Sequence, residues 1–564
     1  MNADLVLGHP RREESTLIED WEAAGASLAN AASRFFDLSV LLDSHITSVD
    51  RKSSNLVTRI DSSLSFLKTT LNRQVTGTHL ALANARKKLT CSVLQLPDTV
   101  LSDIFLAFVY DPHVDSGTSV MNMNNHVELI YRRLHTLLGV CRTWRNIGIS
   151  YGALWAVVPV IDPFDGYQRI LSTELSLQRA AAKSLHFAAS ISCSCLTRYR
   201  ALKGHMHRFN TINIWSRSDS MKGITELLRM SLTNRAPNLS KLSIRNGSHP
   251  DPDNDFFQRS LNDWLGTQLP VLLNPLSVIR LDNIGLDWAR ARFSRNLVEL
   301  WISNITLADR SQVILFLDSL CSAPALRDLK LVDVEAILED EDGSISGDES
   351  LNEVSFPKLQ SLHLESLPFD FLKFLFETIA PGSYCLTLKP GDEIRYDYPS
   401  DEEIDDEDIF ELLKSTTIHR LILSGSEEGF WDTADGLRSI LESVVTVKSL
   451  TLNHYNIDHS ILKALKAPKS RSGKFPNLDT LEIYGAVFTF ELDDLKPEFK
   501  RVLQSHPLQR MVLGGYCRPP SADDYSLDED QELVAWFENR VPNFHLCSDP
   551  DYLPERPNWQ LWDV

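Results

Sequence analysis

Two cysteines and two histidines, spaced in short pairs, are the residues of this chain best suited to hold a metal ion. They form the segments Cys193-Ser194-Cys195 and His205-Met206-His207. Two thiolates and two imidazoles can satisfy tetrahedral zinc, and residues i and i+2 of a strand share one face, so the pairs could converge. The C-x-C and H-x-H spacings are not those of zinc fingers, however. The sequence therefore favours buried cysteines and surface histidines, with no metal and no other cofactor.

Other segments that resemble catalytic motifs each lack a required residue. Ser472-Gly473-Lys474 has no upstream glycine at the spacing of a phosphate-binding loop. The segment Gly343–Gly347 carries Ile345 where a nucleophilic serine would stand. We therefore expect a protein that acts by binding and has no catalytic site.

The composition is that of a globular protein with several domains. The 564 residues suggest two to four domains, and 43% of them are hydrophobic. The net charge of -20 argues against nucleic-acid binding, because phosphate neutralisation needs an excess of Lys and Arg. No apolar run approaches the ~18 residues of a membrane span, and we expect no signal peptide and no membrane contact. The eight scattered cysteines favour a reducing compartment, so we expect the cytoplasm, the nucleus or both.

Acidic residues cluster near 335–350 and 391–411. The first segment contains Glu339-Asp340-Glu341-Asp342, and between Asp392 and Glu411 there are eleven carboxylates and one arginine. Such runs repel themselves, so both segments are interpreted as solvated, mobile insertions. The alternative is a docking surface for a basic partner.

Residues 12–90 are predicted to be helical. Apolar residues recur at steps of three or four from Ile18 to Val49 and again from Leu56 to Leu71. A stripe of this length favours a coiled coil or a long helical hairpin, so residues 12–71 could pair with a second copy or fold back on their own chain. The segment Thr76–His79 is expected to break the helix before a short second one.

A motif of the form L-x-x-L-x-L returns again and again from about residue 183 onward. Most spacings lie between 29 and 33 residues, and Leu386-x-Leu388 could be a further copy within the longest gap. Amphipathic stretches such as 312–320 and 369–379 lie between the copies. This period predicts an α/β fold, a leucine-rich-repeat solenoid of parallel strands and outer helices over 183–545, with a tail at 546–564. The ten copies begin at Phe209, Leu239, Leu276, Leu297, Leu326, Leu359, Ile418, Val447, Leu478 and Leu508.

Alternate residues of these strands face away from the core, on the surface that solenoids use for recognition. Trp301 lies between Leu300 and Ile302, so we expect it on that outward surface as an aromatic anchor among charged side chains. The candidate target-binding residues are Arg280, Glu299, Trp301, Lys330, His363, Arg420 and Glu482.

Residues 92–156 are predicted to form a helical hairpin. Leu96-Pro97 starts the first helix, because proline at the first turn has no amide hydrogen bond to lose. One continuous second helix is expected to carry Leu134 through Trp144, with a polar loop at 111–125 between the two. Leu154-Trp155 is expected to pack back across the hairpin.

The Leu96-Pro97 start, the segment from Val140 to Arg145 and the trailing Leu154-Trp155 together resemble an F-box. With leucine-rich repeats behind it, the whole plan is similar to F-box-like proteins common in fungi. The resemblance implies a non-catalytic subunit of an SCF-type ubiquitin ligase, whose F-box binds a Skp-type adaptor and through it a cullin, while the repeats bind an unknown protein target.

The adaptor-binding positions that this resemblance implies are Leu96, Pro97, Val100, Leu101, Ile104, Phe105, Leu137, Val140, Cys141, Trp144, Leu154 and Trp155. The chain departs from the family at Thr99, where glutamate is usual, and in the long 111–125 loop. The alternative function is a leucine-rich-repeat interaction scaffold that does not engage the ligase.

Overall fold

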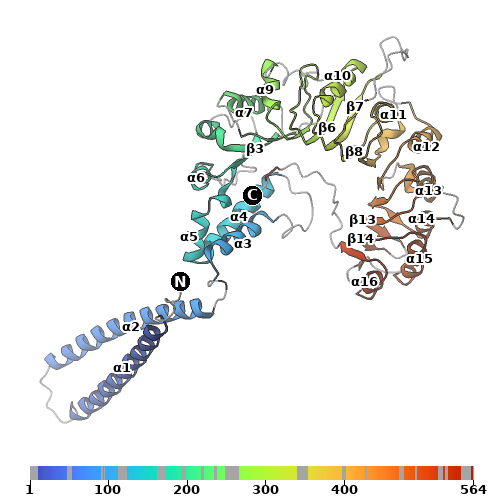
Figure 1. Cartoon of the computed structure of the whole chain (residues 1–564). Coiled ribbons are helices and arrows are strands. Elements are labelled where there is room, and N and C mark those ends of the chain that lie inside the picture. The colour runs from blue at the N-terminus through green and yellow to red at the C-terminus, as the bar shows by residue number, and fades with distance from the viewer. Residues whose placement is uncertain are drawn as a thin grey trace, which may run out of the picture. The chain divides into compact units, whose positions relative to one another are not determined.

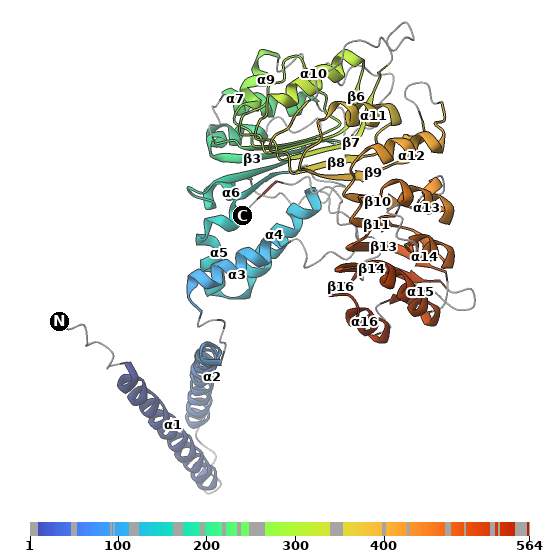
Figure 2. The same cartoon turned by 45° about the vertical axis from the view of Figure 1, so that its right-hand side comes forward.

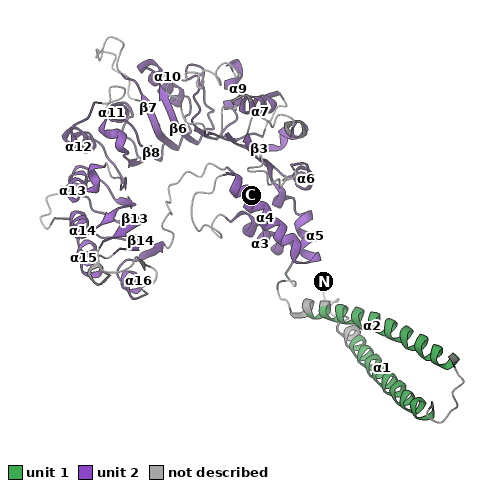
Figure 3. Cartoon of the chain, turned by 180° about the vertical axis from the view of Figure 1, so that it is seen from behind, with its two compact units in different colours: residues 1–96 green, residues 97–564 purple. Residues whose placement is uncertain are grey.

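The computed structural model divides the chain into two compact units, residues 1–96 and residues 97–564 (Figure 3). The structure describes every residue outside the ranges 1–9, 47–53, 91–92, 94–95, 112–122, 162–172, 192–197, 217–220, 234–237, 248–265, 339–353, 397–401, 426–428, 469–474, 490–491, 519–524, 528–530, 548–560 and 563–564. The acidic run Glu339–Asp342 therefore lies outside the described residues.

The first unit consists of two long helices, which confirms the predicted N-terminal helical segment. α1 spans Pro10–Ile46 and α2 spans Ser54–Thr90. The expected break at Thr76–His79 is wrong, because α2 continues through it. The Thr78 hydroxyl donates to the carbonyl oxygen of Gln74 at 2.9 Å, so this polar side chain bonds back within the helix and leaves it intact.

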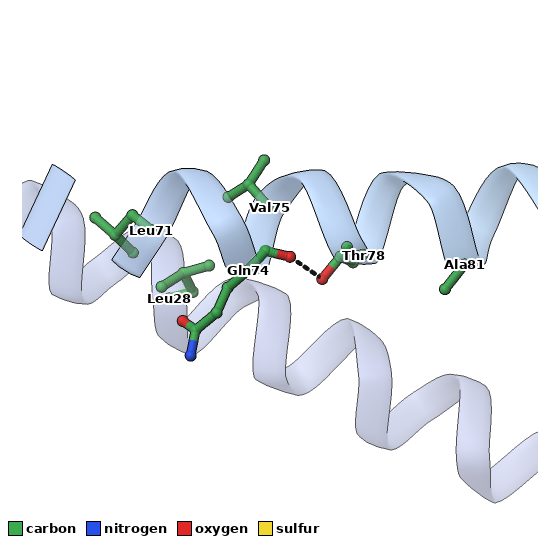
Figure 4. A pocket seen from close by; sticks show the side chains of 7 residues that line it. Leu28, Leu71, Gln74, Val75, Thr78 and Ala81 are labelled. Atoms are coloured by element: carbon green, nitrogen blue, oxygen red, sulfur yellow. Dashed lines mark hydrogen bonds between the residues drawn. The ribbon is translucent and has the colours of Figure 1, made fainter. Parts of the chain in front are cut away.

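Apolar side chains of both helices remain exposed. Leu28 of α1 and Leu71 of α2 line one shallow pocket together with Gln74 and Val75 (Figure 4). Many apolar side chains of this unit are open to solvent, which is an unfavourable state for so long a stripe. They include Trp21, Leu28, Phe35, Leu42, Val57, Leu64 and Leu67.

The second unit is built on one sheet of repeated parallel strands, with helices on its outer side (Figures 1 and 2). From β1 to β11 each strand pairs with the next one in sequence, so the sheet grows one repeat at a time; β13 then pairs with β11 and β12, and β14 pairs with β13 and β16. Among the described pairings, that of β15 with β14 is antiparallel. The strands are β1 Val157–Val160, β2 Leu185–Ile191, β3 Phe209–Ser216, β4 Lys241–Asn246, β5 Val278–Asp282, β6 Glu299–Leu307, β7 Asp328–Ala336, β8 Ser361–Glu365, β9 Cys385–Lys389, β10 Arg420–Ser424, β11 Ser449–Asn453, β12 Asn456–Ile457, β13 Thr480–Phe488, β14 Arg510–Cys517, β15 Tyr525–Ser526 and β16 Asn543–Cys547.

Helices connect most successive strands and cover one face of the sheet (Figure 1). The predicted α/β leucine-rich-repeat solenoid is confirmed by this arrangement of parallel strands and outer helices. The helices of the repeats are α6 Thr173–Arg179, α7 Met221–Thr233, α9 Leu269–Leu273, α10 Arg310–Cys321, α11 Phe369–Thr378, α12 Asp406–Ser415, α13 Ala434–Ser443, α14 His459–Leu465, α15 Leu492–Ser505 and α16 Gln531–Glu538, with 3-10 turns η3 Arg198–Arg208, η4 Gly266–Gln268, η5 Asp392–Arg395 and η6 Phe430–Asp432.

The L-x-x-L-x-L motif coincides with the strands. In β8, for example, Leu362 and Leu364 are buried while His363 between them points to the opposite face. Leu386 and Leu388 form β9, so the additional copy is a strand. The sheet starts earlier than residue 183, because β1 follows directly on the helical segment before it.

Seven of the ten motif copies turn at a residue in the left-handed backbone region. This residue stands two positions after the third apolar residue of the motif, and its φ is 53° at Asn283, 54° at Asn304 and 49° at Asp333. Asparagine, aspartate and glycine tolerate this conformation best. The equivalent positions in other repeats are Ser366, His454, Gly485 and Gly515, each with positive φ.

Where the structure describes it, the acidic segment 391–411 keeps most of its carboxylates exposed but is part of the repeats and not a separate insertion. It supplies the turn η5 and the first half of the outer helix α12. Ile394 and Ile409 are each 1% exposed, so apolar residues between the carboxylates anchor the segment to the core. Arg395 pairs with Glu403 at 2.6 Å. The charge count of the segment takes no account of these two buried isoleucines.

Candidate functional site

Three helices and a 3-10 turn form a helical module at the start of the second unit (Figure 2). They are α3 Asp98–Tyr110, α4 Met123–Val140, α5 Arg142–Ser150 and η2 Gly152–Trp155. The expected single second helix is wrong, because the chain is extended at Cys141. The Cys141 sulfur accepts a hydrogen bond from the Trp144 backbone N–H at 3.4 Å and so starts α5 as its N-cap.

Aromatic side chains hold this helical module together and attach it to the sheet. The rings of Phe105 and Trp144 lie 4.8 Å apart, centroid to centroid. Trp155 is 1% exposed, and its indole N–H donates to the Gly148 carbonyl at 2.8 Å. The hydroxyl of Tyr131 donates to the carbonyl of Val157 in β1 at 2.9 Å. The module and the first strand are therefore joined by buried contacts.

The expected adaptor-binding residues fall into groups that the sequence did not separate. One group packs inside the module, and substitution there would unfold it. A second is half-buried, and a third is exposed and can meet a partner. The buried residues are Leu101, Phe105, Leu137, Leu154 and Trp155; the half-buried ones are Leu96, Cys141 and Trp144; the exposed ones are Pro97, Val100, Ile104 and Val140.

One side of α3 carries an exposed apolar stripe. Pro97, Val100, Ile104 and Phe108 recur at steps of three and four, and we call these four residues the α3 stripe. Its central side chain, Ile104, is 47% exposed. Phe108 was not predicted, although its spacing of four from Ile104 is the signal that would have found it.

The opposite side of α3 is buried, which fixes the orientation of the stripe. Leu101, Phe105 and Val109 are each at most 1% exposed. Arg133 of α4 supports the end of the stripe, because its Nη1 donates to the Phe108 carbonyl at 3.2 Å and its guanidinium lies 5.7 Å from the ring centroid. Val140 and Ile149 are further exposed apolar residues of the module.

Most candidate target-binding residues lie in one row across the sheet. The register pairs Arg280 with Trp301, Trp301 with Lys330, and Lys330 with His363 on consecutive strands. The row then continues through Thr387 to Arg420. We call this set, from Arg280 to Arg420 on the face opposite the helices, the inner row. Glu299 lies two residues before Trp301 on the same face, whereas Glu482 lies in β13.

Trp301 is on the predicted face but is not an exposed anchor. Only 7% of it is accessible, and it packs against Val332. The Nζ of Lys330 lies 4.4 Å from the ring centroid, and the guanidinium carbon of Arg280 lies 5.5 Å from it. Arg280 also donates to Glu299 at 2.6 Å. The charged side chains therefore cover the indole, and the surface that a partner meets is charged.

Glu365, two residues after His363 on β8, pairs with Lys330, His363 and Lys389. It lies 2.6 Å from the Lys389 Nζ, 2.9 Å from the His363 Nε2 and 3.7 Å from the Lys330 Nζ. Burial opposes its ionisation, but the His363 hydrogen bond and the two lysines outweigh that effect and lower the pKa of Glu365 to about 2.

Two further side chains near Glu365 titrate abnormally. Burial, together with the charges of Glu365 and Glu393, raises the pKa of Asp333 to about 6. Burial is also the main reason that the pKa of His363 is lowered. His363 is therefore a neutral member of the cluster at neutral pH.

Glu482 is shielded by two arginines. It is 5% exposed and accepts from the Arg420 Nη2 at 3.1 Å and from the Arg510 Nε at 3.0 Å. Its carboxylate therefore does not face a partner directly. The structure instead offers the half-exposed guanidinium of Arg510, which was not among the predicted residues.

The weakly indicated zinc site gains no support. Cys193 and Cys195 lie outside the described residues. His205 is half-buried, and burial, with the nearby charge of Arg208, lowers its pKa, while His207 is exposed. Within the described part of the chain, no group of three or more His, Cys, Asp or Glu is arranged to hold a metal ion. Among the same residues, no helix has the length and apolar character to cross a membrane.

Comparison with known proteins gives little beyond this geometry. No family model and no curated protein matches the chain. A similar solved chain comes from a structure described as the crystal structure of the Rad7 and Elc1 complex in yeast. The identity is 15%, the match covers 78% of this chain and 94% of that chain, and the TM-score is 0.27. A likeness at this level carries no argument about function.

Proposed function

We propose that this protein is a non-catalytic substrate-recognition adaptor of an SCF-type cullin ubiquitin ligase, in the cytoplasm or nucleus. Its helical module, an F-box of the kind found with leucine-rich repeats in fungi, binds a Skp-type adaptor and through it a cullin. The inner row of the repeats binds the protein target. The observation that carries the proposal is the α3 stripe, an exposed apolar surface on a module that is packed firmly onto the repeats.

The α3 stripe has the features of a protein-binding surface. Three apolar residues of α3 and its N-cap residue Pro97 lie along one side of the helix, and Val100 and Ile104 are more than 40% exposed. Contiguous apolar patches of this kind mark interaction sites. Because buried contacts join the module to β1, a target on the repeats would be held at a fixed place relative to the adaptor, which raises its effective concentration near the ubiquitin-charged enzyme.

The experiment measures binding of the full chain to a purified Skp-type adaptor by isothermal titration calorimetry. Ile104→Lys places a charge in the centre of the α3 stripe and should weaken binding at least about tenfold, which corresponds to about 1.4 kcal/mol. The matched control is Val271→Lys on α9, where the valine is also exposed and belongs to a repeat. Control and wild type should bind equally well.

The second candidate function is an interaction scaffold that does not engage the ligase. The departure at Thr99, which is exposed beside the α3 stripe, favours it. If wild type does not bind the adaptor, or if Ile104→Lys binds as well as wild type, the scaffold replaces the ligase adaptor as the function of the chain.

We also infer that residues 12–71 mediate self-association. The apolar stripes of α1 and α2 are exposed. The two helices also carry net charges of opposite sign. Within residues 12–71, α1 carries seven acidic and two basic residues, whereas α2 carries two basic residues and one acidic residue, counting Lys and Arg as basic. A second copy can bury the stripes while α1 of one chain lies beside α2 of the other. Closure of each hairpin on itself is the alternative.

A further inference from the structure

A short segment near the end of the sequence docks on the inner face of the first repeats. Leu561 and Asn213 are 348 positions apart and exchange two hydrogen bonds. The Leu561 backbone N–H donates to the Asn213 Oδ1 at 2.7 Å, and the Asn213 Nδ2 donates to the Leu561 carbonyl at 3.4 Å.

The chemistry of this contact is that of peptide-backbone recognition. A side-chain amide offers one acceptor and two donors, so it can pair with the N–H and the C=O of one residue. Asn213 is 2% exposed, and its Nδ2 also donates to the Phe187 carbonyl in β2 at 3.2 Å, which fixes the orientation of the amide. A backbone held in this way can carry a variety of side chains, as in other modes of peptide binding.

The two side chains of the docked segment add selectivity. Leu561 is 6% exposed, so its side chain is almost completely covered. The ring of Trp562 lies 5.1 Å from the ring of His126, centroid to centroid, at an angle of 59°. His126 belongs to α4, whose Asn124 donates to the Ser190 hydroxyl of β2 at 3.3 Å. The docking place thus lies where the helical module meets the sheet.

The docking place is continuous with the inner row. Asn213 is the register partner of Ser243, and Ser243 is the partner of Arg280. Two strand spacings of about 4.8 Å separate Asn213 from the start of the row. An extended target segment that runs along the row towards the helical module would therefore reach the place that Leu561 occupies.

We propose that Leu561-Trp562 is an internal ligand of a peptide-binding site at Asn213 and His126, and that it competes with the protein target. The target presents an extended segment with an aliphatic residue followed by an aromatic one. This inference rests on the proposed target-binding role of the inner row. Release of the internal segment opens the site, so the contact is autoinhibitory.

The test uses the full chain and a fluorescein-labelled synthetic peptide with the sequence of residues 556–564. In the variant Leu561→Ser with Trp562→Ala, the internal segment loses its side-chain anchors. Fluorescence anisotropy should show that this variant binds the peptide at least about tenfold more tightly than wild type, because a tethered ligand competes at high effective concentration. A peptide carrying the same two substitutions should not bind.

Two further substitutions, each added to the released variant, locate the site. Asn213→Ala should weaken peptide binding at least about tenfold. His126 lies on α4, outside the sheet, and His126→Ala should weaken peptide binding several-fold. This second variant keeps the test valid if Asn213→Ala disturbs strand β3. Equal peptide binding by wild type and the released variant would overturn the proposal, as would binding that neither Asn213 nor His126 affects.

The same samples separate this inference from the proposed function. All variants keep the α3 stripe, so each should bind the Skp-type adaptor with the affinity of wild type. Normal adaptor binding without peptide binding rejects the internal ligand and leaves the adaptor function standing. Peptide binding without adaptor binding supports the internal ligand and favours the scaffold.

Discussion

Lys330 and Trp301 are register partners on β7 and β6, and the Lys330 Nζ lies 4.4 Å from the centroid of the Trp301 ring. A cation at this distance over an indole is attracted to the negative face of the ring. Arg280 approaches the same ring, and together these side chains leave only 7% of Trp301 accessible. Trp301 therefore contributes mainly to the stability of the fold and to the positions of the charged side chains around it.

A double-mutant cycle measures this contact. Trp301→Leu should lower the free energy of unfolding by about 1–3 kcal/mol, because it removes buried aromatic area. With Lys330→Met as the second substitution, the coupling free energy should be about 0.5–1 kcal/mol in urea unfolding followed by circular dichroism. Lys373→Met on the outer helix α11 is the control and should show no coupling with Trp301. No coupling with Lys330 would mean that the cation contributes nothing to this site.

The abnormal pKa of Asp333 predicts a pH-dependent effect of Asp333→Asn. Folding raises the pKa of Asp333 from 3.8 to about 6. Protonation of Asp333 therefore stabilises the folded chain, and this stabilisation is fully present below pH 3.8 and is lost as the pH rises through 6. The variant should therefore have a higher Tm than wild type at pH 7.5 and an equal one near pH 4. The gain should stay below about 1 kcal/mol, because part of the side chain is exposed to solvent.

Glu365→Gln is the control of opposite sign for the Asp333 measurement. The pKa of Glu365 falls from 4.5 to about 2, so its stabilising contribution is present above pH 4.5 and lost as the pH falls through 2. Glu365→Gln should lower the free energy of unfolding at pH 7 by about 1–3 kcal/mol, with the difference shrinking towards pH 2. If both variants shift Tm in the same direction at neutral pH, the charge balance described for this cluster is incorrect.

The repeat period carried enough information to predict the strands β3 to β11, β13 and β14, because each motif copy needs its own buried apolar pair, whereas β1, β2, β12, β15 and β16 carry no copy. Even the copy hidden in the longest gap, Leu386-x-Leu388, is a strand. The left-handed residues were missed although they leave a signal. Asn283, Asn304 and Asp333 stand at one fixed offset from the motif, and a residue type that tolerates positive φ recurs there.

The candidate site was less predictable. Strand alternation gives the side of the sheet on which a side chain lies, but it does not tell whether neighbouring side chains cover it. Trp301 faces the predicted side, yet the long side chains of Lys330 and Arg280 fold over it. The contact between Asn213 and Leu561 joins residues 348 positions apart, and no local pattern marks it. This contact forms only because the folded chain brings Leu561 next to strand β3.

The exposed stripes of α1 and α2 predict the oligomeric state of the full chain. Wild type should be a dimer or larger assembly in light scattering coupled to size exclusion, because burial of these apolar residues in a second copy is favourable. Phe35→Glu with Leu64→Glu puts charges in both stripes and should give monomers. Ser62→Glu is the matched control, because Ser62 lies outside the apolar series of α2, and it should assemble as wild type does. A monomeric wild type would mean that each hairpin covers its own stripes, and the inferred self-association would then be abandoned.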